Sequence, residues 1–403
     1  MISEKIQLEE FIIKNWTQIN RFIDREMSQY HIPFYSSVDI RESKDKFAPI
    51  DNNLYPAGFN NLCLLDLDKA SREIERTIEH YSPTIWNVAI IVESHTKNLF
   101  YLDNLFYLRK AIEESGRQVD LISFDDNLFS NNEPQTTLTS HSKFELIIKK
   151  ASIQHHKIAT DQQYDLVILN NDQSSPIEID WDKVETPIHP SPQMGWFNRQ
   201  KIEHFDFYAN AIENFCDKFS INPELLKAKH DSIKNIDFSN KDGLDHLADK
   251  VNTFKQSINS DQKIFIKASK GTYGMGIQVV DSGDDILSMN RKNRDRMDIG
   301  KNKIKFTDIL IQEGVDTVLT YDQMPAEVTI YLIGGRSVGG FMRANEQKSN
   351  KENLNSKGMV FKKFCISEIR QNRDDVMKEA VYSVVARLSC LAAAMEVSAM
   401  ETK

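Results

Sequence analysis

The sequence predicts an α/β protein with an N-terminal parallel-sheet domain over residues 1–225 and a second domain over residues 226–403. A strand–helix–strand pattern in the first half predicts parallel strands. A glycine-rich segment between two apolar strands marks the second half. The length of 403 residues suits two or three domains rather than one. Apolar residues make up 40% and charged residues 27%, so an ordinary packed core is expected.

Composition excludes several classes of protein. A formal net charge of −9 argues against a general nucleic-acid binder, which needs a basic face for phosphates. The cysteines form no CxxC pair, so neither a zinc site nor a disulfide framework is indicated. The N-terminal segment mixes acids into its apolar positions, and no stretch approaches the roughly 20 apolar residues of a membrane helix. We expect a cytoplasmic protein without membrane or nucleic-acid partners, and homo-oligomerisation stays open.

The N-terminal domain begins with a predicted helix, because apolar residues recur at helical spacing over residues 4–30. The next part differs. Strand-like pieces at 34–40 and 61–67 flank a polar run that contains prolines and a glycine. This run lacks helical periodicity, so a loop between strands is expected there.

The parallel sheet is predicted from the next elements. Residues 87–94 read as a buried strand, 98–116 as a helix that ends at a glycine, and 118–124 as another strand. Residues 165–172 read as a further strand of the same sheet. Its polar end, Asn170 to Asp172, would lie at the carboxyl edge, where open sheets bind ligands.

Connecting segments follow this sheet. Segment 186–205 is proline-rich at first and then helical, and we expect an ordered loop over a ligand site. His189, Trp196, Asn198 and Arg199 are candidate lid residues there, although Trp196 suits packing better. A helical and polar region from 206 to 260 leads into the second domain, and the polar run 282–305 is expected to be a solvated connection or a lid.

The glycine-rich segment 263–280 is the strongest local signal for a ligand. Its glycines are Gly271, Gly274 and Gly276. A strand enters this loop and a second strand leaves it, unlike a Rossmann turn or a P-loop, which leads into a helix. Such a hairpin suits a flap over the phosphates of ATP, because glycines let backbone N–H groups approach an anion. Lys267 and Lys270 would offer ammonium groups to the phosphates. A simple glycine hairpin with surface lysines is the alternative.

Residues 309–316 form an apolar strand that ends in Gln312, Glu313, Gly314 and Val315. An adenine ring needs a backbone donor and acceptor at its edge and apolar groups on its faces. A strand leading into a linker provides both, and Glu313 would bind the amino group or a ribose hydroxyl. A strand that merely ends in a turn is the alternative for this segment.

Two further strands, 327–333 and 337–344, meet at a Gly-Gly turn and lead into a polar loop. Arginine binds carboxylate and phosphate oxygens with a planar fork. Asparagine carbonyls can complete a magnesium shell. A solvated turn would also be rich in asparagine. The polar residues concentrated here are Arg343, Asn345, Asn353, Asn355, Lys357 and Gly358.

Taken in order, these segments resemble the ATP-grasp superfamily, whose fold has two α+β subdomains clasping ATP. More narrowly, the chain resembles the proteobacterial glutamate–cysteine ligase family. The segments that carry this resemblance are 38–62, 92–98, 189–205 and 341–364. The resemblance extends over most of the chain. It implies an ATP-dependent acid–amino-acid ligase that forms γ-glutamylcysteine, ADP and phosphate from glutamate, cysteine and ATP.

The resemblance also implies a mechanism. ATP would convert a carboxylate into an acyl phosphate, which an amine then attacks. Lys267 and Arg343 would be catalytic by neutralising the transferring phosphoryl group, with Lys270 and magnesium assisting. ATP-grasp enzymes usually end with a Glu-x-Asn pair that binds magnesium, and this chain ends in a helix-like segment without one. The metal candidates are therefore Glu327, Asn353 and Asn355.

The amino-acid substrates are expected to bind the N-terminal domain. Arg41 or Lys46 would hold a substrate carboxylate, and Asp39 or Asp51 an α-ammonium group. His95 lies at the carboxyl edge of the strand 87–94, which favours ligand contact. Each of these residues could instead cap a turn or form a surface ion pair. The candidates are Asp39, Arg41, Lys46, Asp51, Asn53, Asn60, Asn61 and His95.

Rival functions stay open from the sequence. Another ATP-grasp enzyme, such as a glutathione synthetase or an amino-acid or peptide ligase, would share the fold and differ in substrates. A catalytically silent nucleotide-binding regulator is suggested by the missing Glu-x-Asn pair. A phosphotransferase would need a catalytic base beside a hydroxyl acceptor, and no kinase-like signature is present.

Overall fold

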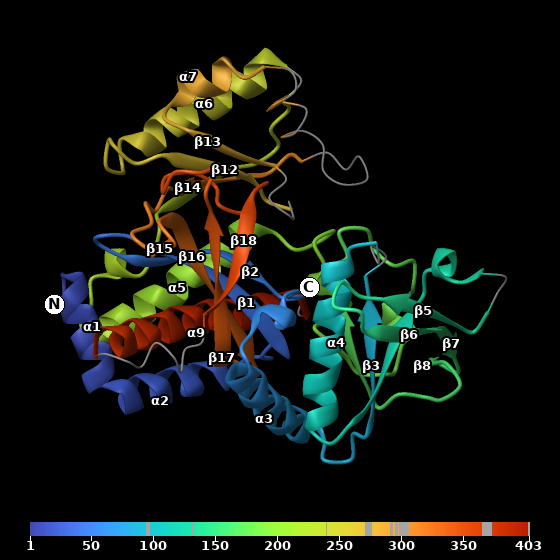
Figure 1. Ribbon diagram of the computed structural model, residues 1–403. Helices are drawn as coiled ribbons and strands as arrows, with labels where there is room; N and C mark the ends of the chain where they lie inside the picture. Colours follow the sequence, from blue (N-terminus) through green and yellow to red (C-terminus); the bar gives the residue numbers. More distant parts are fainter. Residues whose placement is uncertain are drawn as a thin grey trace.

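The computed structural model describes residues 1–93, 97–130, 133–238, 240–270, 276–290, 293–294, 297, 306–364 and 373–401. These residues fold around three main sheets, a central antiparallel sheet, a parallel sheet beside it and a smaller sheet that stands at one end (Figure 1). Short 3-10 helices lie in the connections at Phe59–Asn61, Asp126–Leu128, Trp181–Lys183, Pro192–Met194 and Pro223–Leu225.

The central sheet has the strand order β18-β17-β16-β1-β2, and every neighbouring pair in it is antiparallel. The short β15 pairs with β16. β1 pairs with β16, so this sheet contains strands from both parts of the chain that the sequence assigns to separate domains. The strands are β1 Tyr35–Glu42, β2 Phe47–Asn53, β15 Thr320–Tyr321, β16 Met324–Ile333, β17 Arg336–Asn345 and β18 Met359–Phe364.

Helix α9, Arg373–Glu401, crosses one face of the central sheet and packs against β1, β2 and α5 (Figure 1). Its stretch Met377–Met400 is long and apolar enough for a membrane span, which corrects the expectation that no such stretch exists. In the structure 89% of the most apolar part is buried, which is typical of a core helix with apolar residues all round. The helices packed on it are α1 Lys5–Lys14, α2 Trp16–Met27 and α5 Lys201–Phe219.

The predicted parallel sheet is present, with strand order β10-β9-β3-β4-β6-β5. β3 pairs in parallel with β4 and β9, and only β5 is antiparallel to its neighbour. The strand expected at 61–67 is wrong, because helix α3 begins at Leu64. The elements are α3 Leu64–Tyr81, β3 Asn87–Val92, α4 Leu99–Glu114, β4 Gln118–Ser123, β5 Gln135–Thr139, β6 Glu145–Lys150, β9 Leu166–Asn170 and β10 Ile188–His189, with the hairpin β7 Ser152–Gln154 and β8 Lys157–Ala159.

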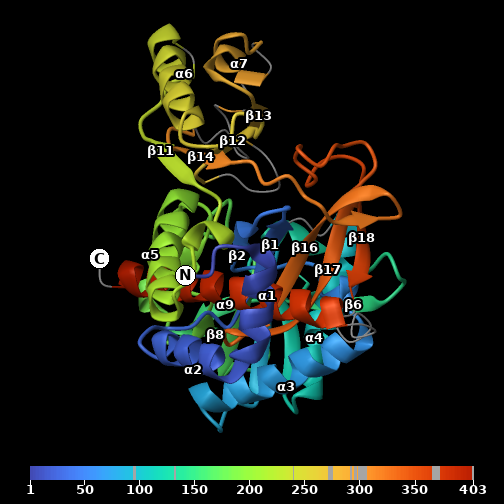
Figure 2. The same cartoon turned by 90° about the vertical axis from the view of Figure 1, so that its left-hand side faces the viewer.

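The smaller sheet, with order β11-β14-β12-β13, carries the glycine hairpin, and both views place it at one end of the molecule (Figure 2). β12 pairs antiparallel with β13, as the sequence predicts. The tip of the hairpin, 271–275, lies outside the described residues. Apolar side chains of α6 and α7 cover the sheet. The elements are β11 His230–Ile233, α6 Lys241–Lys255, β12 Ile264–Ala268, β13 Ile277–Val280, α7 Gly283–Leu287 and β14 Ile309–Glu313.

Candidate functional site

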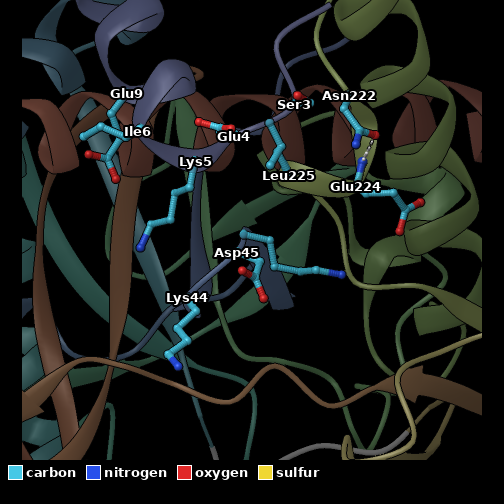
Figure 3. A pocket seen from close by; sticks show the side chains of 11 residues that line it. Ser3, Glu4, Lys5, Ile6, Glu9, Lys44, Asp45, Asn222, Glu224 and Leu225 are labelled. Atoms are coloured by element: carbon cyan, nitrogen blue, oxygen red, sulfur yellow. Dashed lines mark hydrogen bonds between the residues drawn. The ribbon is translucent and has the colours of Figure 1, made fainter.

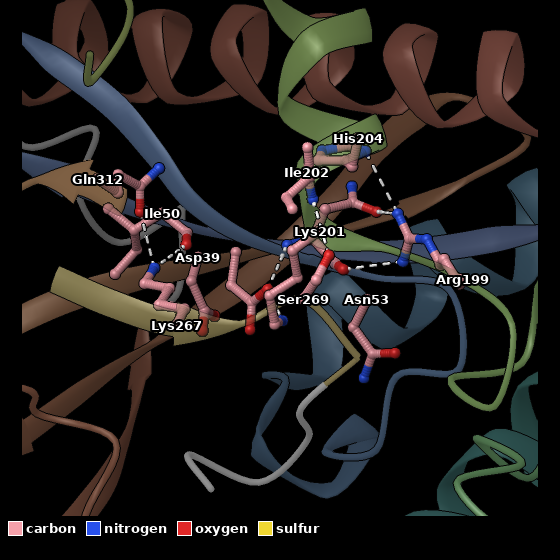
Figure 4. A network of polar contacts seen from close by, with 12 residues as sticks. Asp39, Ile50, Asn53, Arg199, Lys201, Ile202, His204, Lys267, Ser269 and Gln312 are labelled. Atoms are coloured by element: carbon pink, nitrogen blue, oxygen red, sulfur yellow. Dashed lines mark hydrogen bonds and ion pairs between the residues drawn. The ribbon is translucent and has the colours of Figure 1, made fainter. Parts of the chain in front are cut away.

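Lys267 lies where the smaller sheet meets the central sheet. Its Nζ donates hydrogen bonds to the Ile50 carbonyl and to Gln312 Oε1, both at 2.7 Å (Figure 4). Burial lowers the pKa of Lys267 to about 8, although the nearby Asp51 opposes the shift. Two residues predicted to bind ATP, Lys267 and Gln312, are therefore in direct contact.

Gln312 has an unused donor. Its side chain is 1% exposed, and its Nε2 has no hydrogen-bond partner among the described residues. A buried amide N–H without an acceptor costs about 1–3 kcal/mol. A ligand that supplied an acceptor at this position would remove that cost.

Glu313, the next residue on β14, is fully engaged by protein groups. Lys46 Nζ donates to both carboxylate oxygens at 2.9 Å, and the Lys229 backbone N–H donates to Oε2 at 2.8 Å. The sequence assigned Lys46 to an amino-acid substrate and Glu313 to ATP. The structure brings the two together at the segment that the sequence predicts to bind ATP.

A chain of charges crosses the central sheet. Glu327 accepts from Arg41 Nε at 2.8 Å and from Arg343 Nη1 at 2.7 Å. Arg343 Nη1 also donates to Asp39 Oδ2 at 2.8 Å. Burial alone raises the pKa of Glu327, but the two arginines outweigh burial and lower it. For Asp39 burial outweighs the attraction of Arg343, so its pKa is raised.

Arg41 and Arg343 differ in how many of their guanidinium N–H groups have hydrogen-bond partners. Arg41 is 2% exposed. Its Nη1 donates to the Val315 carbonyl at 3.4 Å, and its Nη2 donates to the Glu352 carbonyl at 2.7 Å. The guanidinium of Arg41 is thus committed to protein acceptors. Arg343 Nε is buried and lacks a partner among the described residues. Arg343 Nη2 also donates to Asp39 Oδ1 at 3.5 Å, so within the described part of the chain the unpartnered guanidinium N–H of this cluster is the buried Nε of Arg343.

Asp51 lies beside Lys267, on the strand next to Asp39. Residues Asp39 and Asp51 are direct partners in the β1–β2 register. Lys201 Nζ donates to Asp51 Oδ1 at 2.6 Å. Partial burial alone would raise the pKa of Asp51, but Lys201 and Lys267 outweigh it and lower the pKa. The sequence did not single out Lys201; its place in the first turn of the helix after the predicted lid loop was the available signal.

The base of the glycine hairpin contacts the segment before α5. Lys270 Nζ donates to the Phe197 carbonyl at 3.1 Å, and the Lys201 N–H donates to the Ser269 carbonyl at 2.8 Å. Gly276 has a φ of +66°, and a Cβ there would lie 2.6 Å from the Ala268 Cβ, so the position requires glycine. Gly271, Gly274 and His95 lie outside the described residues.

The predicted asparagines make local contacts. Asn53 Oδ1 accepts from the Tyr55 N–H at 3.0 Å, and Asn60 Nδ2 donates to Asn61 Oδ1 at 3.4 Å. These hydrogen bonds shape the loop after β2 and do not reach Lys267 or Arg343. Their role as substrate ligands stays a prediction.

The predicted magnesium set does not fit a metal ion well. Both oxygens of Glu327 are held by arginines, and Glu327 is 1% exposed. Asn353 Oδ1 accepts from the Asn355 N–H at 3.0 Å and so holds its own turn. Among the described residues, no three His, Cys, Asp or Glu side chains gather closely enough to hold a metal.

An open surface hollow lies behind the β1–β2 turn (Figure 3). Its charged lining mixes both signs and includes Lys5, Lys44 and Glu224. Lys46 also lines it, while the Nζ of Lys46 reaches Glu313. Neither Lys267 nor Arg343 is among the residues that line this hollow.

Comparisons with known proteins extend over nearly the whole chain. The family model described as glutamate-cysteine ligase (GshA) matches residues 9–397. A crystal structure of a Methylobacillus flagellatus protein, named provisionally as a gamma-glutamylcysteine synthetase, is 29% identical with a TM-score of 0.87, and the match covers 98% of this chain and 96% of that one. A glutathione synthetase-like effector from Globodera pallida is 8% identical over 89% of this chain and 84% of that one, with a TM-score of 0.43, too low to support an inference. A search of curated proteins gives no significant match.

Proposed function

The chain belongs to the glutamate–cysteine ligase family, a class of ATP-dependent ligase, and from this premise we propose that the cluster around Lys267 and Arg343 carries out the ligation. The single observation that supports this location best is the contact between Lys267 and Gln312. It joins a buried cation to an amide with an unused donor, beside the base of the glycine hairpin. This combination suits a nucleotide with its phosphates.

We propose further that the two sheets form an ATP-grasp arrangement. The smaller sheet supplies Lys267 on β12 and Gln312 on β14, and the central sheet supplies Arg343 on β17. The two sheets meet at the contact between Lys267 and the Ile50 carbonyl and at the pair of Lys46 with Glu313. ATP would lie between them, with Gln312 Nε2 donating to an acceptor of the nucleotide.

The ligation needs an activated carboxylate, because a carboxylate oxygen is a poor leaving group. In the proposed reaction the γ-phosphoryl group of ATP is transferred to the glutamate carboxylate. The cysteine amine then attacks the acyl phosphate, and phosphate leaves. Lys267 and Lys270 would neutralise phosphate oxygens, and Arg343 would stabilise charge on the transferring group. The enzyme's contribution is then positioning and charge neutralisation rather than a protein nucleophile.

Carboxylates beside this cluster suit the ammonium groups of the substrates. Asp51 has a side chain that is 37% exposed, and its Oδ2 accepts no hydrogen bond from the described residues. Asp39 lies opposite it on β1. We propose that Asp51 or Asp39 holds an α-ammonium group and that the unpartnered Nε of Arg343 donates to an oxyanion. Magnesium is proposed only as the companion of ATP, and no step is assigned to a metal bound by Glu327.

A screen for phosphate release tests the proposal. The protein, ATP and Mg²⁺ are incubated with pairs of amino acids, and the nucleotide products are separated. Glutamate with cysteine should give ADP and phosphate. AMP with pyrophosphate would indicate an adenylating enzyme, and turnover only with γ-glutamylcysteine and glycine would indicate a glutathione synthetase. No turnover with any pair would favour a nucleotide-binding regulator.

A further inference from the structure

A closed ring of buried polar groups lies beneath the proposed site. Arg199 forms a bidentate pair with Glu396, at 2.8 and 2.9 Å, and donates to the carbonyl and Oδ1 of Asn52, both at 2.9 Å. His204 lies 3.2 Å from both Glu396 Oε2 and Ser389 Oγ. Asn52 Nδ2 donates to Ser389 Oγ at 3.2 Å, which closes the Arg199 ring.

All members of this ring are buried. Arg199 and Glu396 are each 1% exposed. Burial alone raises the pKa of Glu396, but Arg199 and His204 outweigh it and lower the pKa to about 2. Burial is also the main reason that the pKa of His204 is lowered. The ring therefore holds one arginine–glutamate ion pair with His204 beside it.

The ring joins three elements that meet at the site. Asn52 belongs to β2, Arg199 and His204 flank the start of α5, and Ser389 and Glu396 belong to α9. Successive residues of a strand point to opposite faces. Asn52 points toward α9, and its neighbour Asp51 points away from it, toward Lys201. Arg199 and Lys201 lie two residues apart at the start of α5, and Figure 4 shows both in this network.

Fixing Asn52 also fixes the groups beside it on β2. The carbonyl of Ile50 accepts from Lys267, and the carboxylate of Asp51 accepts from Lys201. The ring therefore constrains the positions of Lys267 and Lys201 relative to each other. A shift of about 1 Å in such groups can lower a rate by about a hundredfold, even when its cause lies away from the reacting atoms.

We propose that Glu396, on the C-terminal helix, is a positioning residue for the ligation: through Arg199 and Asn52 it holds Asp51, Lys201 and Lys267 in one arrangement. This inference rests on the proposed function, which places the nucleotide phosphates and an ammonium group at those residues. Glu396 touches no substrate in this account. It acts only through the ring.

Paired variants test the role of the ring. Glu396→Gln removes the charge that Arg199 needs, and this variant can fail to fold because it strands a buried cation. Asn52→Ala keeps the Arg199–Glu396 pair and cuts the side-chain links to β2, so it should fold. Arg387→Met is the matched control, since Arg387 is a 3% exposed residue of α9 that bonds to Asp24, Asn20 and the Gly335 carbonyl.

Each variant is measured for melting temperature, for kcat and both amino-acid KM values, and for the Kd of a non-hydrolysable ATP analogue. Assayed well below its melting temperature, Asn52→Ala should lower kcat/KM by about tenfold to a hundredfold. It should also bind the ATP analogue more weakly than wild type does. Arg387→Met should lose stability and keep wild-type kinetic and binding constants. Wild-type values for Asn52→Ala in all of these would overturn the proposal.

The same measurements separate this inference from the proposed function. If the wild-type protein makes no ADP with any amino-acid pair, the ligase proposal fails. The analogue Kd still tests the ring in that case, because Lys267 and Lys201 are held by it whatever the acceptor substrate. Weaker binding by Asn52→Ala but not by Arg387→Met would then support the ring, and equal binding would reject it.

Discussion

Lys46 Nζ lies 2.9 Å from each carboxylate oxygen of Glu313, and this pair ties the β1–β2 turn to the last residue of β14. The pair is largely buried, with side chains 11% and 4% exposed. Its position places Lys46 beside the segment that we propose binds ATP. The sequence had placed Lys46 with the amino-acid substrates, because its neighbours in the chain are there.

Replacing Lys46 with glutamine should weaken ATP binding more than glutamate binding. Removal of one partner of a buried ion pair lowers the free energy of unfolding by about 3–5 kcal/mol, and the partial exposure of Lys46 favours the low end of this range. The KM for ATP should rise while the KM for glutamate stays near wild type. Lys44→Gln is the control, since Lys44 is an exposed residue of the same turn. A raised glutamate KM with normal ATP kinetics would return Lys46 to the amino-acid subsite.

The activity should depend on the protonation of Lys267. Burial lowers the pKa of this lysine to about 8, and only its charged form neutralises phosphate. We expect kcat/KM for ATP, which reports the free enzyme, to fall as the pH rises through about 8. Lys267→Arg should remove that limb of the profile, because arginine stays charged. An identical alkaline limb in Lys267→Arg would assign the titration to another group.

The same lysine predicts a change in stability of the opposite sign. Its folded pKa lies below the ordinary 10.5, so between about pH 8 and 10.5 the unfolded chain binds the proton and the folded chain does not. Stability therefore rises with pH in this window, by up to about 3 kcal/mol from this group. Denaturant unfolding should show this rise in wild type and not in Lys267→Met, so the difference between their free energies of unfolding should change above pH 8. A constant difference from pH 7 to 10 would contradict it.

Arg41→Ala should be mainly a loss of stability. The guanidinium is buried, and it holds Glu327 and two backbone carbonyls. Loss of the partner leaves Glu327 with Arg343 alone, so a decrease of about 3–5 kcal/mol in the free energy of unfolding is expected. Glutamate kinetics of the folded protein should stay near wild type when assayed well below the melting temperature. A large rise in glutamate KM without a loss of stability would restore the role that the sequence predicted for Arg41.

Arg343→Lys should show the reverse pattern. Lysine can keep one charged contact with Glu327 or Asp39 but has no planar fork for an oxyanion. We expect kcat/KM for glutamate to fall by about a hundredfold, about 2.7 kcal/mol of transition-state stabilisation. The Kd of an ATP analogue measured without amino acids should change little. Kinetic constants close to wild type would remove Arg343 from the reaction.

Local patterns explain which elements the sequence predicted well. In segment 87–124, the spacing of apolar residues within each element is enough to predict a strand, a helix and a second strand. All three are present in the structure. The 61–67 piece was misread because a short apolar run fits either a strand or the first turn of a helix. The later residues Ala70, Ile74 and Ile78, four apart and buried, carried the helical period that decides the question.

By itself the sequence determined the chemistry that the site can draw on: the lysine strand, the glycine hairpin, the Gln312–Val315 segment and Arg343, all of which show locally. Only the tertiary structure decided how these groups are paired. Arg199 and Glu396 are 197 positions apart, and Arg41 and Glu327 are 286 apart. No local period links such residues, because β1 meets β16 and α9 meets β2 only after the chain has folded. The free energy of a buried charge depends on its partner, so which arginine is fully engaged by protein acceptors and which keeps an unpartnered N–H is a property of the fold.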